Sequence, residues 1–137
     1  MLQMYSDGID VAAGAAVPFN NIVYVKGNSA THSAPATAEL NQRGIYVVHV
    51  DAYGSVAAAG DFGIQLAVNG VPRLDAISEA TVAVGDLATA SFDCVVSVAQ
   101  SNCPCNCTSA PTTVQLLNSS EVGSTGAHYN MLITKLC

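Results

Sequence analysis

Apolar and polar residues alternate along short stretches of the chain, and turn-forming residues separate these stretches about every ten residues. In the clearest stretch, residues 44–53, the alternation places Tyr46, Val48, Val50 and Ala52 on one side. A period of two with one apolar side is typical of a β-strand that buries one face. The expected strands are residues 21–26, 36–40, 44–53, 62–68, 71–74, 81–84, 87–99, 113–117 and 129–136.

The turns between these stretches favour antiparallel neighbours. Asn69-Gly70 separates two apolar stretches, which is the strongest short signal for a β-hairpin. Helix signals are almost absent, since the one alanine-rich run, residues 56–60, is short and ends in glycine. We therefore expect an all-β fold, an antiparallel sandwich or barrel of about eight to ten short strands.

A chain of 137 residues is long enough for one domain with a substantial core. Residues 1–16 are small and polar without a core-like period, so we expect an N-terminal arm followed by one domain over residues 17–137. Asp7 and Asp10 interrupt the first apolar stretch and no basic segment precedes it, so we expect a chain without a signal peptide. No apolar run is long enough for a membrane-spanning helix.

The sequence contains few charged residues, which bears on what covers the strand faces that point away from the core. Only 10% of the residues are charged although 50% are hydrophobic, and the net charge is −6. Four basic residues cannot form a nucleic-acid-binding surface. Sparse charge favours contact between identical copies on the second strand faces, with Ile45, Val47 and Val95 as candidates. The alternative is a thick sandwich in which both faces are covered within one chain.

His49 lies on the mixed side of the strand at residues 44–53 and is a fourth candidate for the contact. Three copies meeting on a threefold axis could bind a metal or an anion, or respond to pH. The alternative is a hydrogen-bonded interface histidine without such a role.

Chemistry-bearing motifs do not support an enzyme. The sequence contains no phosphate-binding loop, no zinc-protease motif and no nucleophile elbow. Cys94 could meet His49 on a neighbouring strand, yet its place in an apolar row predicts a small buried side chain. We therefore expect a protein without catalytic residues or a cofactor.

Five cysteines are present, and three of them, Cys103, Cys105 and Cys107, follow one another at every second position. This spacing does not match the usual zinc patterns, and neighbours at i and i+2 do not easily bond to each other. Free thiols, disulfides to Cys94, to Cys137 or to another subunit, and a metal site at the three clustered cysteines stay open as alternatives.

Five stretches of the sequence together resemble the tumour necrosis factor and complement-globular-head superfamily. The Gly44-Ile45-Tyr46 start of a strand looks like the Gly-x-Tyr strand of that group, and the Asn-Gly hairpin looks like its middle strands. The matching stretches are residues 17–20, 44–48, 64–74, 115–118 and 127–136. The resemblance covers residues 17–137 and implies a ten-strand jelly roll that assembles as a compact homotrimer.

Small proteins of this type include phage head decorations, head-fibre heads and the tips of spore-surface filaments. No collagen-like Gly-X-Y tract precedes the domain here, which favours the phage particle. The resemblance thus implies a structural protein on the capsid surface of a virion, with the capsid shell as partner. Alternatives are a receptor- or glycan-binding tip on a tail fibre, bacterial or spore surface, using Tyr5, Tyr53 and Tyr129, and a cysteine-based metal-binding protein.

Overall fold

The computed structural model describes residues 1–99 and 111–137, which form ten β-strands and no helix. Accordingly, none of the described residues belongs to a helix able to cross a membrane. The strands are β1 (Leu2–Val11), β2 (Asn21–Val25), β3 (Ala30–Ala34), β4 (Thr37–Leu40), β5 (Gly44–Val56), β6 (Gly60–Val68), β7 (Val71–Val82), β8 (Ala88–Val98), β9 (Thr112–Asn118) and β10 (Ser124–Lys135).

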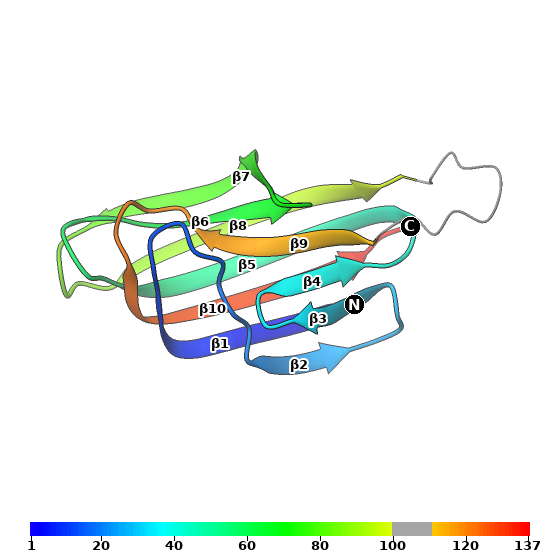
Figure 1. The fold of residues 1–137 in the computed structure, drawn as a ribbon, viewed down its shortest axis with the longest axis horizontal. Coiled ribbons are helices and arrows are strands. Elements are labelled where there is room, and N and C mark those ends of the chain that lie inside the picture. The colour runs from blue at the N-terminus through cyan, green and yellow to red at the C-terminus, as the bar shows by residue number, and fades with distance from the viewer. Residues whose placement is uncertain (100–110) are drawn as a thin grey trace.

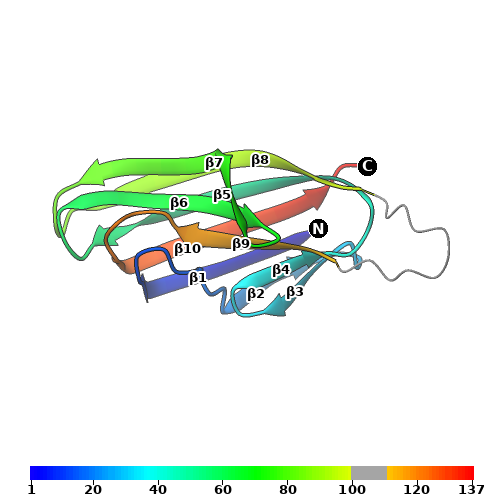
Figure 2. The ribbon, with the colours of Figure 1, turned by 45° about the horizontal axis from the view of Figure 1, so that its top comes forward.

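The strands form two five-stranded sheets that pack face to face (Figure 1). Sheet A has the order β2-β1-β10-β5-β8, and sheet B has the order β3-β4-β9-β6-β7. Every paired neighbour is antiparallel. The prediction of an all-β antiparallel jelly-roll sandwich is confirmed, and the tilted view shows the two layers (Figure 2).

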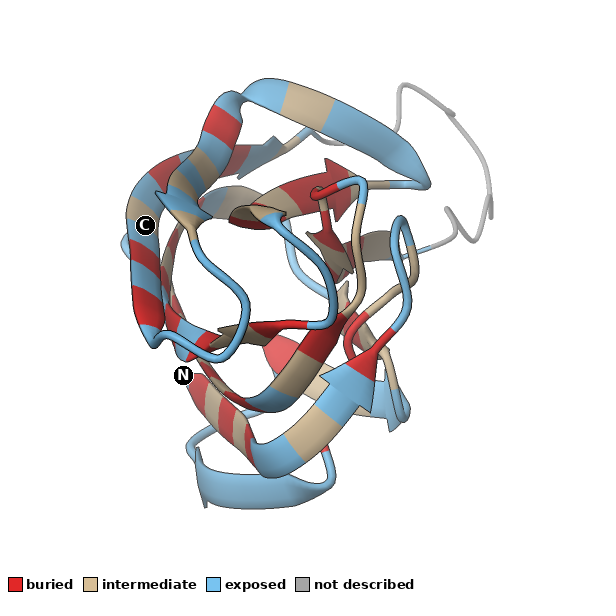
Figure 3. Cartoon of the chain, turned by 90° about the vertical axis from the view of Figure 1, so that its left-hand side faces the viewer, coloured by how far each residue is buried: buried red, intermediate tan, exposed pale blue. Residues whose placement is uncertain are grey.

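The core lies between the sheets, and burial alternates along the strands (Figure 3). The predicted apolar row Tyr46, Val48, Val50 and Ala52 is buried. Its partners on the other sheet include Phe62, whose ring lies parallel to a buried tyrosine of β10. The period of two therefore identified the inward face of β5 correctly.

Gly44 and Tyr46 show why the Gly-x-Tyr pattern suits the start of β5. Gly44 has a φ of +148°, and a Cβ there would lie 2.0 Å from the carbonyl oxygen of Cys137. The chain end can thus lie against β5, where the amide of Ile45 donates to that same oxygen at 3.0 Å. Two residues later, the buried Tyr46 places its hydroxyl 2.7 Å from the carbonyl oxygen of Gln42.

The predicted hairpin at Asn69-Gly70 is present. Asn69 and Gly70 have φ values of 51° and 79°, the left-handed pair that a type I′ turn requires. The strand after the turn is longer than predicted, because Val71–Val82 is continuous where two strands were expected. Its polar middle residues are tolerated since β7 is an edge strand of sheet B.

The expected N-terminal arm is instead strand β1, paired with both β10 and β2 inside sheet A. Leu2, Met4 and Val11 are buried in the core, so the boundary at residue 16 does not separate two structural units. Two features concealed this strand. Ser6 occupies a buried position, where its hydroxyl lies 2.5 Å from the carbonyl oxygen of Pro18, and the pairing shifts register after it.

Candidate assembly surface

The outward face of sheet A, which we call the A face, gathers the predicted contact residues. Strands β1, β10, β5 and β8 contribute every second residue to it, because the intervening residues point into the core. Its main side chains are Gln3, Tyr5, Asp7, Ile45, Val47, His49, Asp51, Tyr53, Asp93, Val95, His128 and Leu132.

One end of the A face is apolar. Val47 lies directly opposite Val95 across the β5–β8 pair, and Leu132 of β10 lies opposite His49. Ile45 and Val95 are 39% and 53% exposed. The structure thus brings all four predicted contact residues onto one surface of two neighbouring strands, facing away from the core.

The middle of the A face carries a histidine held by two carboxylates. His49 Nε2 lies 2.7 Å from Asp51 Oδ2, and His49 Nδ1 is in close contact with Asp93 Oδ1. These hydrogen bonds raise the pKa of His49, the bond to Asp93 most, although partial burial opposes the effect. We call this group the His49 clasp. The alternation along β5 already places Asp51 on the same side as His49, but only strand pairing places Asp93 opposite it.

The far end of the A face carries an aromatic stack. The ring of His128 lies between those of Tyr5 and Tyr53, with ring centroids 6.0 and 4.9 Å away. His128 Nδ1 is 3.3 Å from Asp7 Oδ1. The third tyrosine proposed for glycan binding, Tyr129, is fully buried and cannot offer its ring to a sugar.

A second apolar surface lies at the edge where the two sheets approach each other. We use the name edge patch for the exposed apolar side chains along β7, Val71, Leu74 and Ile77, which are 65%, 89% and 41% exposed. Arg73 joins β7 to β8 there, because its Nη1 donates to the carbonyl oxygen of Val95 at 2.7 Å and its guanidinium pairs with Asp75. The edge patch was not predicted, because nothing in the local sequence marks β7 as the edge strand of a sheet.

Neither family models nor curated proteins match this sequence. Solved structures do match the fold. The globular domain of zebrafish complement 1qA has a TM-score of 0.73 at 9% identity, over 99% of this chain and 96% of its own. Murine APRIL at pH 5.0 has a TM-score of 0.66 at 9% identity, over 98% of both chains. The PRD1 vertex protein P5 has a TM-score of 0.63 at 16% identity, over 99% and 96%.

The fold is the tumour necrosis factor-like jelly roll. At these identities the matches establish the fold of the chain and leave its role to be argued from the surfaces. The similarity covers the whole of this jelly roll, including the first strand, which the sequence resemblance had left outside the domain.

Cys94 lies on the inward side of β8 in this jelly roll and is only 7% exposed. Burial raises the pKa of its thiol to about 11. His49 lies on the neighbouring strand but points to the opposite face, where it contacts carboxylates. The two side chains therefore do not form the nucleophile–base pair considered from the sequence.

We expect Cys94 to resist alkylation in the folded protein. At about pH 8, a thiol with this pKa is ionised in roughly one molecule per thousand, and burial further limits access. Peptide mass spectrometry after iodoacetamide treatment should show modified Cys137, which is exposed, and unmodified Cys94. Urea-unfolded protein provides the control, in which both should react. Equal reaction rates in the folded protein would contradict the buried position.

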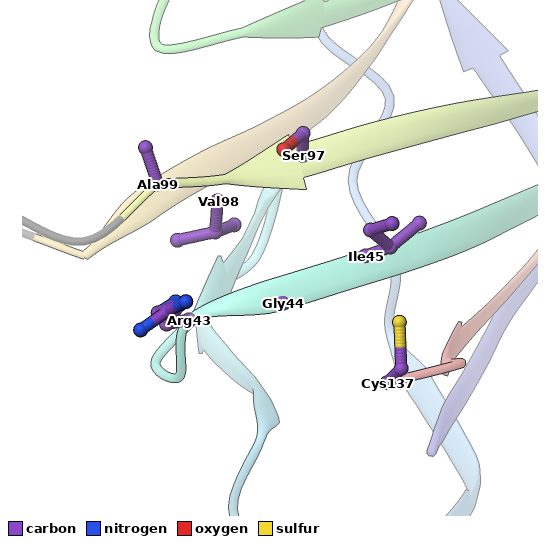
Figure 4. Close-up of a pocket in the computed structure, with 7 residues that line it drawn as sticks. All are labelled: Arg43, Gly44, Ile45, Ser97, Val98, Ala99 and Cys137. Carbon is purple, nitrogen blue, oxygen red and sulfur yellow. The ribbon is translucent and has the colours of Figure 1, made fainter.

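Cys137 lies at the apolar end of the A face. It lines an open pocket of about 680 Å³ between the start of β5 and the end of β8 (Figure 4). Ile45 and Val98 contribute apolar walls to this pocket, and Arg43 lies at its side. The cluster of Cys103, Cys105 and Cys107 lies outside the described residues. Its metal-binding alternative therefore stays a sequence-based prediction.

Proposed function

We propose that this protein is a non-enzymatic structural component of a virion surface, a homotrimeric capsid decoration or head-fibre protein. The likeness to the PRD1 vertex protein P5, at 16% identity over nearly the whole of both chains, supports a particle partner such as the capsid shell. The complement 1qA domain and APRIL have the same fold, so the fold alone does not indicate a virion.

The observation that carries the assembly proposal is that large apolar side chains are exposed at separate places among the described residues: on the A face, along the edge patch and on β2. The A face exposes Ile45 and Val95 on sheet A, and the edge patch exposes Leu74 and Ile77 on β7. Two different surfaces that meet head to tail make a heterologous contact, which closes into a ring when the rotation allows. Three copies close such a ring at 120°, in agreement with the homotrimer implied by the sequence resemblance.

The low charge content supports the same arrangement. With 10% charged residues and a net charge of −6, a single jelly roll leaves many apolar side chains in water. Leu74, at 89% exposed, is the largest single example. Covering both surfaces by identical copies removes this apolar area from water, which is favourable at roughly 25 cal/mol per Å² before the cost of association.

Sedimentation equilibrium of the purified chain tests the assembly. We expect a species of three times the 14.0 kDa chain mass at micromolar concentration, and a stable species of one chain mass would contradict the trimer.

Antibodies against the purified protein test the location. They should label phage particles in electron micrographs, and labelling confined to bacterial or spore surfaces would favour the filament alternative instead.

A further inference from the structure

The geometry of the His49 clasp fixes the protonation state that it prefers. Both ring nitrogens face carboxylate oxygens, Nε2 at 2.7 Å from Asp51 Oδ2 and Nδ1 in close contact with Asp93. A neutral imidazole has one N–H donor, so one carboxylate would then face a nitrogen lone pair. Only the doubly protonated ring donates to both carboxylates. The clasp carries a charge of −1 in that state and −2 after the ring loses its proton.

Among the described residues, Asp51 and Asp93 are the titratable groups that contact His49. The other side chains around it carry no charge. On β10, Leu132 lies opposite it, and on its own strand Val47 precedes it on the same side. On β8, the residues beside Asp93 on the outward side are a serine and a valine. Arg73, the basic residue of β7 that reaches β8, pairs with Asp75. His128 is a separate group that contacts Asp7 and two tyrosines at the far end of the face.

The clasp lies where assembly would cover it. It bridges β5 in the A face and β8 at the sheet edge, beside Val47 and Val95. In the proposed ring, the edge patch of one copy meets the A face of the next, so the clasp carboxylates lose contact with water. Removing charge from water is unfavourable, so a clasp of −2 opposes assembly more than a clasp of −1.

We propose that the His49 clasp makes assembly of this jelly roll dependent on pH, with proton binding at His49 favouring the trimer. This inference rests on the proposed homotrimer. By linkage, if assembly favours the protonated ring, protonation favours assembly by the same factor. The trimer is therefore strongest below the pKa that His49 has in the clasp of the free chain, and it weakens as the pH rises through the still higher pKa of the assembled chain.

Sedimentation equilibrium at about pH 6 and about pH 8, with a reducing agent, tests the inference. For each pKa unit that assembly adds to His49, the trimer weakens about tenfold per chain once the pH has risen above the pKa of the assembled clasp. The variant His49→Gln cannot bind the proton and should show the weak, high-pH behaviour at both pH values. Asp93→Asn removes one negative charge, so it should form a tighter trimer than the wild type at about pH 8.

Two matched variants locate the effect. His32→Gln changes a histidine of β3 in sheet B, and His128→Gln changes the other carboxylate-paired histidine of the A face. Both should keep the pH dependence of the wild type. Far-UV circular dichroism checks that each variant is folded.

The outcomes separate this inference from the proposed function. A trimer with the same dissociation constant at both pH values overturns the clasp inference and leaves the trimer intact. A trimer that tightens at high pH, or a His49→Gln variant with wild-type pH dependence, overturns it as well. A single-chain mass at every pH and concentration overturns the proposed assembly and the clasp inference with it.

Discussion

Replacing Val95 with aspartate is expected to convert the proposed trimer into folded single chains. Val95 is 53% exposed in the single chain and lies opposite Val47, so the substitution changes the A face without opening the core. In the proposed contact, the new carboxylate would be buried without a partner, which costs about 3–5 kcal/mol. We therefore expect the trimer to weaken at least about a hundredfold, since each 1.4 kcal/mol is a factor of ten.

Sedimentation velocity together with circular dichroism measures this result. Ser33→Asp is the matched control, because it adds the same charge at an exposed position of β3 in sheet B. This control should sediment as the wild type does. A Val95→Asp chain that keeps the wild-type trimer dissociation constant would show that the A face lies outside the subunit contact.

Replacing Tyr129 with alanine is expected to give the largest loss of fold stability. The Tyr129 ring is fully buried, and its centroid lies 6.3 Å from that of Phe62 across the sandwich. Its hydroxyl is 2.7 Å from Ser124 Oγ, and burial raises its pKa. Truncating such a ring removes buried apolar contacts and leaves a cavity, so the free energy of unfolding should fall by about 3–5 kcal/mol.

Tyr129→Phe separates the ring from the hydroxyl. This variant keeps the ring in the core and loses one hydrogen bond, while Ser124 Oγ still lies 3.5 Å from the carbonyl oxygen of Val11. We expect a loss of about 1 kcal/mol. Urea unfolding at equal chain concentration measures both variants, because assembly links apparent stability to concentration. Equal losses in the two variants would mean that the hydroxyl, and not the packed ring, carries the contribution.

The strands predicted most accurately are those whose alternation is uninterrupted. In β5 and β8, apolar side chains occupy every second position, and the structure turns these rows toward the core, with Phe92 and Val98 of β8 partly buried. The Asn69-Gly70 turn was predictable because its backbone requirement is local. Strands β1 and β3 were missed, since a buried serine at position 6 and short polar side chains in β3 hide the period of two.

Only part of the A face could be predicted, because some of its contacts join residues that are far apart in the sequence. Ile45, Val47, His49 and Val95 could be named because each departs from, or lies opposite, an apolar row in its own strand. Asp93 could not be assigned to His49, because the two are 44 positions apart and meet only through the β5–β8 register. The edge patch was also inaccessible, since nothing local marks β7 as a sheet edge.

The sequence by itself determined the all-β class, the inward rows of the long strands and the scarcity of charge. These follow from the period of side-chain direction and from composition, which are properties of neighbouring residues. Only the tertiary structure decided that residues 2–11 belong to sheet A, that the edge strands β7 and β8 of the two sheets lie side by side, and that two carboxylates enclose His49. Strand order and register arise from pairing between distant segments, and the energy of that pairing depends on the whole core at once.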